Sequence, residues 1–224
     1  MSTLGVFKEH FGDSYSCFAR EDYCRDTNDL ASELVGKYFA FNSRVVRITE
    51  TEAYRGSEDP ASHAFRGKSK RNESMFGPAG CLYIYLSYGI HRCVNIVAGD
   101  LGEPSGILIR SFGPFISEPV VAEKLKRAGF TPMSVASIGP GRLGKALEVE
   151  LEDDGLDLCS ANSKAFIFYK IDEPVFDPLT KSDAVPEVKC FPRVGISKGT
   201  ELPWRYVDIN AHFTKKQLVT TIPS

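Results

Sequence analysis

The sequence predicts an α+β fold, a single domain built on a largely antiparallel β-sheet with a few helices. Segments with strand-like apolar patterns outnumber helix-like segments, and the two kinds do not alternate as a doubly wound parallel sheet requires. The chain has 224 residues, of which 42% are hydrophobic and 25% charged. This size and composition fit one domain over residues 1–224 with a substantial buried core.

The first half of the chain contains the clearest secondary-structure signals. Residues 1–25 are aromatic but irregular, so we expect a peripheral arm there. Apolar residues at helical spacing, an Asx cap and Gly36 as a stop predict a helix over Asn28–Val35. Alternating apolar and polar residues predict a strand over Val45–Glu50.

Two further strand-like segments, Cys81–Leu86 and Cys93–Ala98, predict a hairpin. Gly89 lies in their short connection, which places Tyr88 at the tip. Alternation along the first strand puts Tyr83 and Tyr85 on one face, opposite aliphatic residues.

The second half supplies the remaining elements. We expect strands over Gly106–Phe112, Lys164–Ile171 and Arg205–Ile209, and helices over Glu118–Ala128 and Arg142–Leu147.

Composition argues against several classes of protein. No run of 18 apolar residues exists, and the N-terminus lacks the apolar core of a signal peptide. We therefore expect no membrane association and an intracellular location, cytoplasmic in a bacterium or nuclear in a eukaryote. The six cysteines form no C-x-x-C pair, and no histidine stands at a zinc-ligand offset. They predict buried free thiols, with no disulfide, metal or cofactor.

Charge is distributed unevenly along the chain. The net charge of −2 argues mildly against nucleic-acid binding. However, the segment from Arg66 to Arg71, which includes Lys70, carries four cations and no acid. Acidic residues concentrate over Glu148–Asp157, where we expect a solvated loop. A surface polarised in this way favours a polyanionic partner on one side.

Glu50, Glu52 and Tyr54 have the same parity, so an extended backbone points all three to one side. On spacing alone, two solvated acids at a strand end are the more ordinary interpretation. The neighbouring Tyr54, and His63 a short loop later, favour a reactive site instead. A desolvated carboxylate beside another acid has a raised pKa, and it can activate water or stabilise a cationic sugar transition state.

Tyr88 is difficult to explain as a packing residue. At a hairpin tip, followed by Gly89, Ile90 and His91, it has no local apolar partner. Exposed aromatic tips of this kind commonly act as wedges, including wedges between stacked bases.

The segment GPGRLGK (residues 139–145) is a near match to two nucleotide-binding motifs. Ala146 stands where a P-loop needs Ser or Thr for magnesium, and the preceding residues lack the hydrophobic strand of a dinucleotide fold. We therefore expect no nucleotide site.

Several short motifs occur here in one order. They are ETEAY, a histidine after a short acidic loop, RN-x-x-MF, LYIYLSYG with an asparagine seven residues after the tip, ILIR, GPGRL and RVGIS. Over Leu30–Asn210 this arrangement resembles the alkyladenine (3-methyladenine, methylpurine) DNA glycosylase family. The resemblance implies a single mixed α/β domain around a curved, largely antiparallel β-sheet, with peripheral helices and a protruding, DNA-inserting β-hairpin. It also implies a monomer that acts on double-stranded DNA containing damaged purines.

The resemblance also implies a role for individual residues. Glu52 matches the base that activates water, and Arg110 and the carbonyl of Val194 match groups that hold that water. The implied base-binding residues are Tyr54, His63, Tyr85 and Asn95, of which Asn95 disfavours the amino group of guanine. The implied DNA contacts are Tyr88 as the inserted residue, with Ile90, His91, Lys70 and Arg71 around it.

The predicted function is hydrolysis of the N-glycosidic bond of alkylated purines, by base flipping and a glutamate-activated water, leaving an abasic site. Expected substrates are 3-methyladenine and 7-methylguanine, with hypoxanthine and ethenoadenine as further candidates. No lysine lies in the motif core, so we expect a monofunctional enzyme without a lyase step. Two alternatives stay open at this point. One is a catalytically silent lesion-binding protein, and the other is a glycosidase that uses Glu50 with Glu52.

Overall fold

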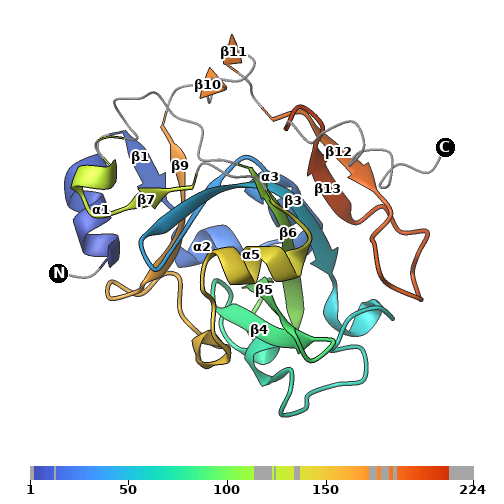
Figure 1. Ribbon diagram of the computed structural model, residues 1–224. Coiled ribbons are helices and arrows are strands. Elements are labelled where there is room, and N and C mark those ends of the chain that lie inside the picture. The colour runs from blue at the N-terminus through green and yellow to red at the C-terminus, as the bar shows by residue number, and fades with distance from the viewer. Residues whose placement is uncertain are drawn as a thin grey trace.

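The computed structural model describes residues 3–12, 14–113, 123, 125–133, 137–171, 176–177, 182–183 and 186–211. Its central feature is an eleven-stranded sheet in which every strand pair is antiparallel except β3 with β7, which confirms the predicted α+β class (Figure 1). The main path runs through β1 (Tyr15–Cys17), β9 (Ala165–Lys170), β2 (Tyr38–Phe41), β3 (Arg44–Tyr54), β6 (Ser105–Gly113), β5 (His91–Ala98) and β4 (Leu82–Ser87).

Shorter strands extend this path. They are β12 (Val188–Phe191), β13 (Arg205–Asp208), β7 (Thr131–Pro132) and β8 (Ser137–Ile138), and a separate pair is formed by β10 (Phe176–Asp177) and β11 (Ser182–Asp183). The described helices are α1 (Thr3–Phe11), α2 (Arg20–Tyr23), α3 (Thr27–Leu34) and α5 (Pro140–Ala146). Single turns of 3₁₀-helix are η1 (Gly56–Glu58), η2 (Glu73–Phe76) and η3 (Leu151–Asp153).

The predicted strands and the hairpin pairing are confirmed, with shifted ends. β3 continues past the predicted end to Tyr54 and carries both glutamates. The predicted helix at Asn28–Val35 is α3, and its cap is Asp26, whose side chain accepts hydrogen bonds from two backbone N–H groups of the first turn. Most of the predicted helix Glu118–Ala128 lies outside the described residues.

The N-terminal segment, expected to be a peripheral arm, contains α1 and β1. Phe7 and Phe11 lie four residues apart on one face of α1 and are both buried. The Phe7 ring centroid is 4.4 Å from that of Phe168 on β9. Aromatic residues whose spacing along the sequence looks irregular therefore form a second apolar cluster against the sheet.

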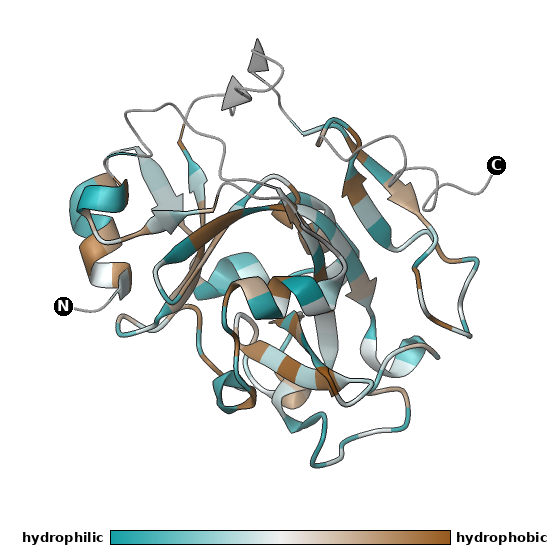
Figure 2. Ribbon diagram, in the orientation of Figure 1, coloured by the Kyte–Doolittle hydropathy of each residue, from teal (hydrophilic) through white to brown (hydrophobic). Residues whose placement is uncertain are grey.

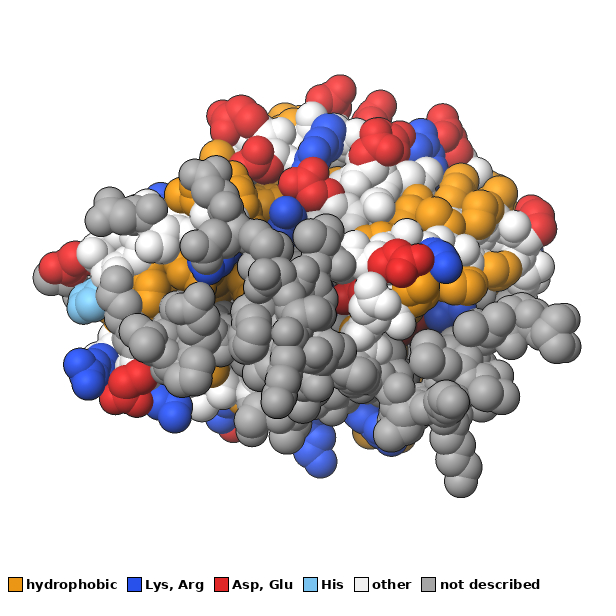
Figure 3. Space-filling view, turned by 90° about the horizontal axis from the view of Figure 1, so that it is seen from above, with side chains coloured by type: hydrophobic (Ala, Val, Ile, Leu, Met, Phe, Trp, Pro, Cys, Tyr) orange, Lys and Arg blue, Asp and Glu red, His pale blue; other side chains and the backbone are white. Residues whose placement is uncertain are grey.

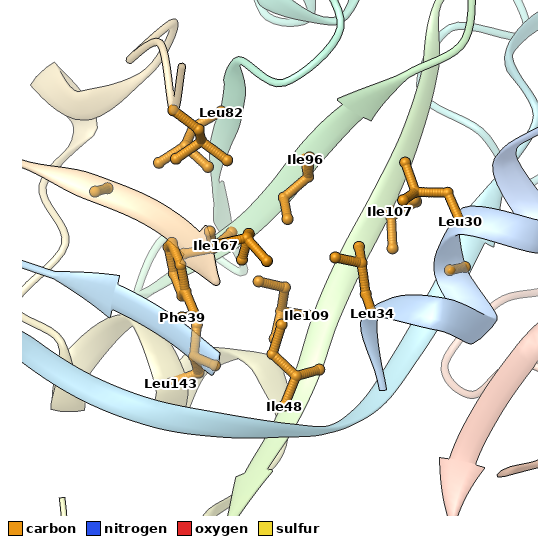
Figure 4. Close-up of a cluster of buried hydrophobic side chains, with 14 of the residues drawn as sticks. Leu30, Leu34, Phe39, Ile48, Leu82, Ile96, Ile107, Ile109, Leu143 and Ile167 are labelled. Atoms are coloured by element: carbon orange, nitrogen blue, oxygen red, sulfur yellow. The ribbon is translucent and has the colours of Figure 1, made fainter. Parts of the chain in front are cut away.

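The main core lies between the sheet and helices α3 and α5. In Figure 4, Leu30 and Leu34 of α3 and Leu143 of α5 point toward the aliphatic side chains of the sheet. Alternation along β4 sends Leu82 and Ile84 into this core, as Figure 2 shows by the alternating bands on that strand. The tyrosines of β4 therefore face the opposite side.

Two smaller expectations need correction. All six cysteines are free thiols, but Cys24 and Cys190 are exposed instead of buried. The segment Glu148–Asp157 is not simply a solvated loop, because it contains η3 and Asp153 is buried. Among the described residues, no helix has the length and apolar character needed to cross a membrane.

Candidate functional site

A cleft of about 700 Å³ opens on the tyrosine face of the hairpin. Its lining comes from the end of β3, the loop after it, the β4–β5 hairpin, β6 and the segment at 194–198. The sequence-predicted residues among the lining are Tyr54, His63, Arg71, Tyr85, Tyr88, Asn95, Arg110 and Val194. Folding thus brings together groups that are spread over most of the chain.

Glu52 lies beneath this lining and is completely buried. Its Oε2 accepts a hydrogen bond from the Tyr54 hydroxyl at 2.8 Å and faces Arg110 Nη1 at 3.3 Å. Its Oε1 accepts from the backbone N–H of Val194 at 2.7 Å. The three residues that touch the carboxylate all line the cleft, so they connect Glu52 to it.

Burial raises the pKa of Glu52, because the charged form loses its hydration. The charge of Arg110 and the two hydrogen bonds oppose this shift, and the nearby Glu50 adds to it. The net direction is upward. A carboxylate with a raised pKa is a stronger base than an exposed one, which suits a general base.

Glu50 has the same parity as Glu52 but a different environment. Its Oε1 is 3.0 Å from both Arg110 Nε and Arg205 Nη1, and its Oε2 accepts from Ser111 Oγ at 2.5 Å. Both oxygens are therefore engaged in a buried ionic network. A glycosidase needs its two carboxylates on opposite sides of the scissile bond, whereas Arg110 bridges these two from one side.

Aromatic rings form the walls of the cleft. The His63 and Tyr85 ring centroids are 4.5 Å apart in an edge-on arrangement, and Tyr85 stacks on Tyr83 at 5.6 Å. His63 Nδ1 is 2.8 Å from the Tyr83 hydroxyl. Desolvation, with a smaller contribution from the charge of Arg71, lowers the pKa of His63, which favours the neutral ring.

Asn95 also lines the cleft. Its side-chain Nδ2 donates to the carbonyl of Tyr83 at 3.0 Å, and the residue is only 5% exposed. This hydrogen bond between the two hairpin strands fixes the amide plane. A fixed amide discriminates between donors and acceptors on anything that enters the cleft.

The tip of the hairpin lies at the cleft and carries exposed side chains. Tyr88 is 91% exposed and Ile90 is 71% exposed. Tyr88 and Gly89 both have positive φ angles, which close a tight turn with the Ile90 N–H bonded to the Ser87 carbonyl. The large exposed side chain expected at the tip is thus present.

The GPGRLGK segment supports this hairpin. It supplies the N-cap and nearly all of α5, which lies across β5 in Figure 1. A Cβ at position 141 would lie 2.5 Å from His91 Cγ, and one at 144 would lie 2.2 Å from the Arg92 carbonyl oxygen. The two glycines therefore permit close helix–strand packing, a role that the sequence motif alone did not indicate.

Cations border the cleft. Arg66, Arg71 and Lys198 line it, and the Arg71 guanidinium is 5.9 Å from the Tyr85 ring centroid. Lys70 is exposed but not part of the lining. The parts of the chain that the structure describes contain no cluster of three or more His, Cys, Asp or Glu side chains able to hold a metal ion.

Sequence reasoning missed the buried residues that hold this site together. Arg193 pairs with Asp59, and Arg205 pairs with Glu50, across large sequence separations. The RVGIS motif includes Arg193, but neither its partner nor its burial follows from the motif. Charged residues are rarely buried unless paired, so only the fold reveals such partners.

Residues 21–212 match the family model for methylpurine-DNA glycosylase. The chain belongs to this family. A Nitrosospira multiformis protein, provisionally named a 3-methyladenine DNA glycosylase, is 38% identical over 83% of this chain and 86% of its own length. Proteins with the same provisional name from Rhodopseudomonas palustris and Rickettsia felis are each 37% identical. They align with 88% and 84% of this chain, and with 90% of their own lengths. The order of motifs thus identified the methylpurine-DNA glycosylase family correctly.

Proposed function

We propose that this protein is a monofunctional, monomeric DNA glycosylase that excises alkylated purines from double-stranded DNA and leaves an abasic site. The observation that carries the proposal is the desolvated Glu52, connected through Tyr54, Arg110 and Val194 to an aromatic cleft beside an exposed hairpin tip. A flipped purine has the flat shape that such a cleft accepts.

Binding begins with the hairpin. Tyr88 enters the duplex and fills the space left by the extrahelical nucleotide, while Ile90, His91, Lys70 and Arg71 contact the surrounding DNA. The base stacks between Tyr54 on one face and His63 with Tyr85 on the other. A base alkylated at N3 or N7 carries a positive charge, which aromatic faces attract. Asn95 selects against the exocyclic amino group of guanine.

Chemistry then needs a water molecule at C1′ of the sugar. Glu52 accepts a proton from this water as its oxygen bonds to C1′, and the N-glycosidic electron pair leaves with the base. Arg110 and the carbonyl of Val194 hold the water. In the structure the Val194 N–H donates to Glu52 Oε1, which places this residue next to the carboxylate.

An alkylated purine is already a good leaving group. The protein therefore mainly supplies water and stabilises the oxocarbenium-like sugar, and an ionised Glu52 does both. The candidate substrates are 3-methyladenine and 7-methylguanine, followed by the neutral bases hypoxanthine and ethenoadenine.

Complete burial of Glu52 also suits a second candidate, a silent protein that binds lesions without cleaving them. The test is release of free base from methylated duplex DNA, measured by chromatography for the wild type and Glu52→Gln in parallel. We expect free 3-methyladenine from the wild type alone. No release from either protein, with tight binding to abasic-site DNA, would favour the silent binder. Equal release from both would reject Glu52 as the base.

A further inference from the structure

A buried ion pair lies directly behind the cleft. Arg193 and Asp59 have fully buried side chains and form a bidentate pair, with Arg193 Nη2 at 2.8 Å from Asp59 Oδ1 and Arg193 Nη1 in contact with Asp59 Oδ2. Arg193 Nη1 also donates to the carbonyl of Ala53 at 2.8 Å. The guanidinium therefore joins the end of β3, the loop that leads to His63, and the segment that begins at Val194.

The same guanidinium stacks on aromatic rings. It lies 4.6 Å from the Tyr54 ring centroid and 5.0 Å from that of Trp204. Tyr54 lines the cleft and Arg193 does not, so the guanidinium covers the side of the ring that faces away from the cleft. Its chain neighbour Val194 donates the 2.7 Å hydrogen bond to Glu52.

We infer that the Arg193–Asp59 pair is a positioning device that sets the plane of Tyr54 and the position of Val194 relative to Glu52. The inference rests on the proposed function, since it assigns these two residues to the base-binding and reacting parts of the site. Arg193 acts through its neighbours and does not touch the substrate.

The geometry of the pair favours this role over simple stabilisation. A guanidinium in a bidentate pair has a fixed plane, and a ring stacked on it takes its orientation from that plane. Lysine would keep the positive charge, but it lacks the paired N–H donors that bind both carboxylate oxygens and the planar surface that stacks on a ring. Displacements of about 1 Å in a catalytic arrangement can lower rates about 100-fold, so the orientation of Tyr54 and Val194 matters for chemistry.

The molecule contains a matched control. Arg47 and Asp208 form another buried pair, with Nη2 and Oδ2 2.7 Å apart and side chains 5% and 2% exposed. Arg47 also lies on β3, toward its opposite end, and neither residue lines the cleft. Removal of this pair eliminates a buried ion pair but leaves the contacts of Tyr54, Val194 and Glu52 unchanged.

The test compares Arg193→Lys and the double variant Arg193→Met/Asp59→Asn with the control Arg47→Met/Asp208→Asn. Each double variant removes both charges, so no unpaired buried charge prevents folding. Asparagine at position 59 keeps an acceptor for the Ala61 N–H. Trp204 is the single tryptophan, and its emission reports whether the stack is intact independently of activity.

Two functional quantities are measured on folded protein. The first is the single-turnover rate of 3-methyladenine release. The second, in the Glu52→Gln background, is the ratio of affinities for a duplex with a methylated adenine and the same duplex with an abasic-site analogue. We expect both Arg193 variants to lose about 10- to 100-fold in rate, to lower the affinity ratio, and to change Trp204 emission. The control should stay within about twofold of the wild type in rate.

Equal losses in the control, or wild-type values in both Arg193 variants, would overturn the inference. A wild type that releases no base would instead reject the proposed activity. In that case the affinity ratio decides: a fall in the Arg193 variants alone supports the positioning of Tyr54, and an unchanged ratio rejects it.

Discussion

Two glutamates two residues apart on β3 show how local environment separates structural from reactive groups. Glu50 is engaged by two guanidinium groups and Ser111 Oγ, which leaves its carboxylate no free oxygen for chemistry. Glu52 shares only one of these cations and is otherwise held by the neutral donors of Tyr54 and Val194. This difference makes Glu52 the better candidate for the base.

The raised pKa of Glu52 predicts the pH dependence of base release. Only the ionised carboxylate accepts a proton from water, so the rate rises as pH increases through the pKa of Glu52. Because burial shifts this pKa upward, the ascending limb lies above the range of an exposed glutamate. The measurement is the single-turnover rate against pH at saturating enzyme. An ascending limb of the pH–rate profile centred on the pKa of an ordinary exposed glutamate would contradict this assignment.

At the scale of elements, the β4–β5 hairpin is contacted by two other segments of the chain. The glycines of α5 pack against His91 and Arg92 on β5. From the acidic segment, Asp154 Oδ1 accepts from the Ile84 N–H of β4 at 2.8 Å, and Glu150 pairs with Arg92 at 2.5 Å. The segment that was expected to be a solvated loop thus helps to hold the hairpin in place.

Tyr88→Ala tests the wedge itself. The variant should bind a lesion in duplex DNA much more weakly, while its affinity for the same lesion in single-stranded DNA changes little. The reason is that only a duplex has a gap for the side chain to fill. Binding is measured by fluorescence anisotropy in the Glu52→Gln background. Equal losses on both DNAs would refute insertion.

Gly144→Ala tests the support of the hairpin. A methyl group 2.2 Å from the Arg92 carbonyl oxygen must displace either α5 or β5. Overpacking of this kind costs about 1–3 kcal/mol, so we expect the free energy of unfolding to fall by that amount in urea titrations. We also expect weaker binding to duplex lesions. Lys145→Ala, at an exposed position of the same helix, is the control and should leave stability nearly unchanged.

At the scale of the whole molecule, the charge distribution matters more than the net charge of −2. Arg66, Arg71, Arg110 and Lys198 line the cleft, whereas Glu52 is covered by its neighbours. Viewed from above, acidic side chains gather along one edge of the described surface (Figure 3). An acidic protein can therefore still offer a cationic surface to DNA.

The salt dependence of DNA binding tests this polarity. Each phosphate contact made by a cation releases counterions, so Lys70→Ala should reduce the slope of log affinity against log salt by about 1. Lys189→Ala is the control, since Lys189 on β12 pairs with Glu187 and does not line the cleft. An unchanged slope in the Lys70 variant would remove Lys70 from the DNA interface.

The sequence by itself determined the fold class, most strands, the hairpin with its exposed tip, and the family. These depend on periodicity, turn residues and the order of motifs, which are local properties of the chain. It also indicated that Glu50 and Glu52 share one side, because side chains alternate along a strand.

Only the tertiary structure decided which partners the side chains contact. The packing of α1, the glycines of α5 against β5, and the partners of Glu50, Glu52 and Arg193 all involve residues far apart in sequence. Burial, hydrogen bonding and ion pairing depend on distances in space, and those distances cannot be read from a single sequence. The pKa of a carboxylate, and so its chemistry, is therefore decided by the folded molecule.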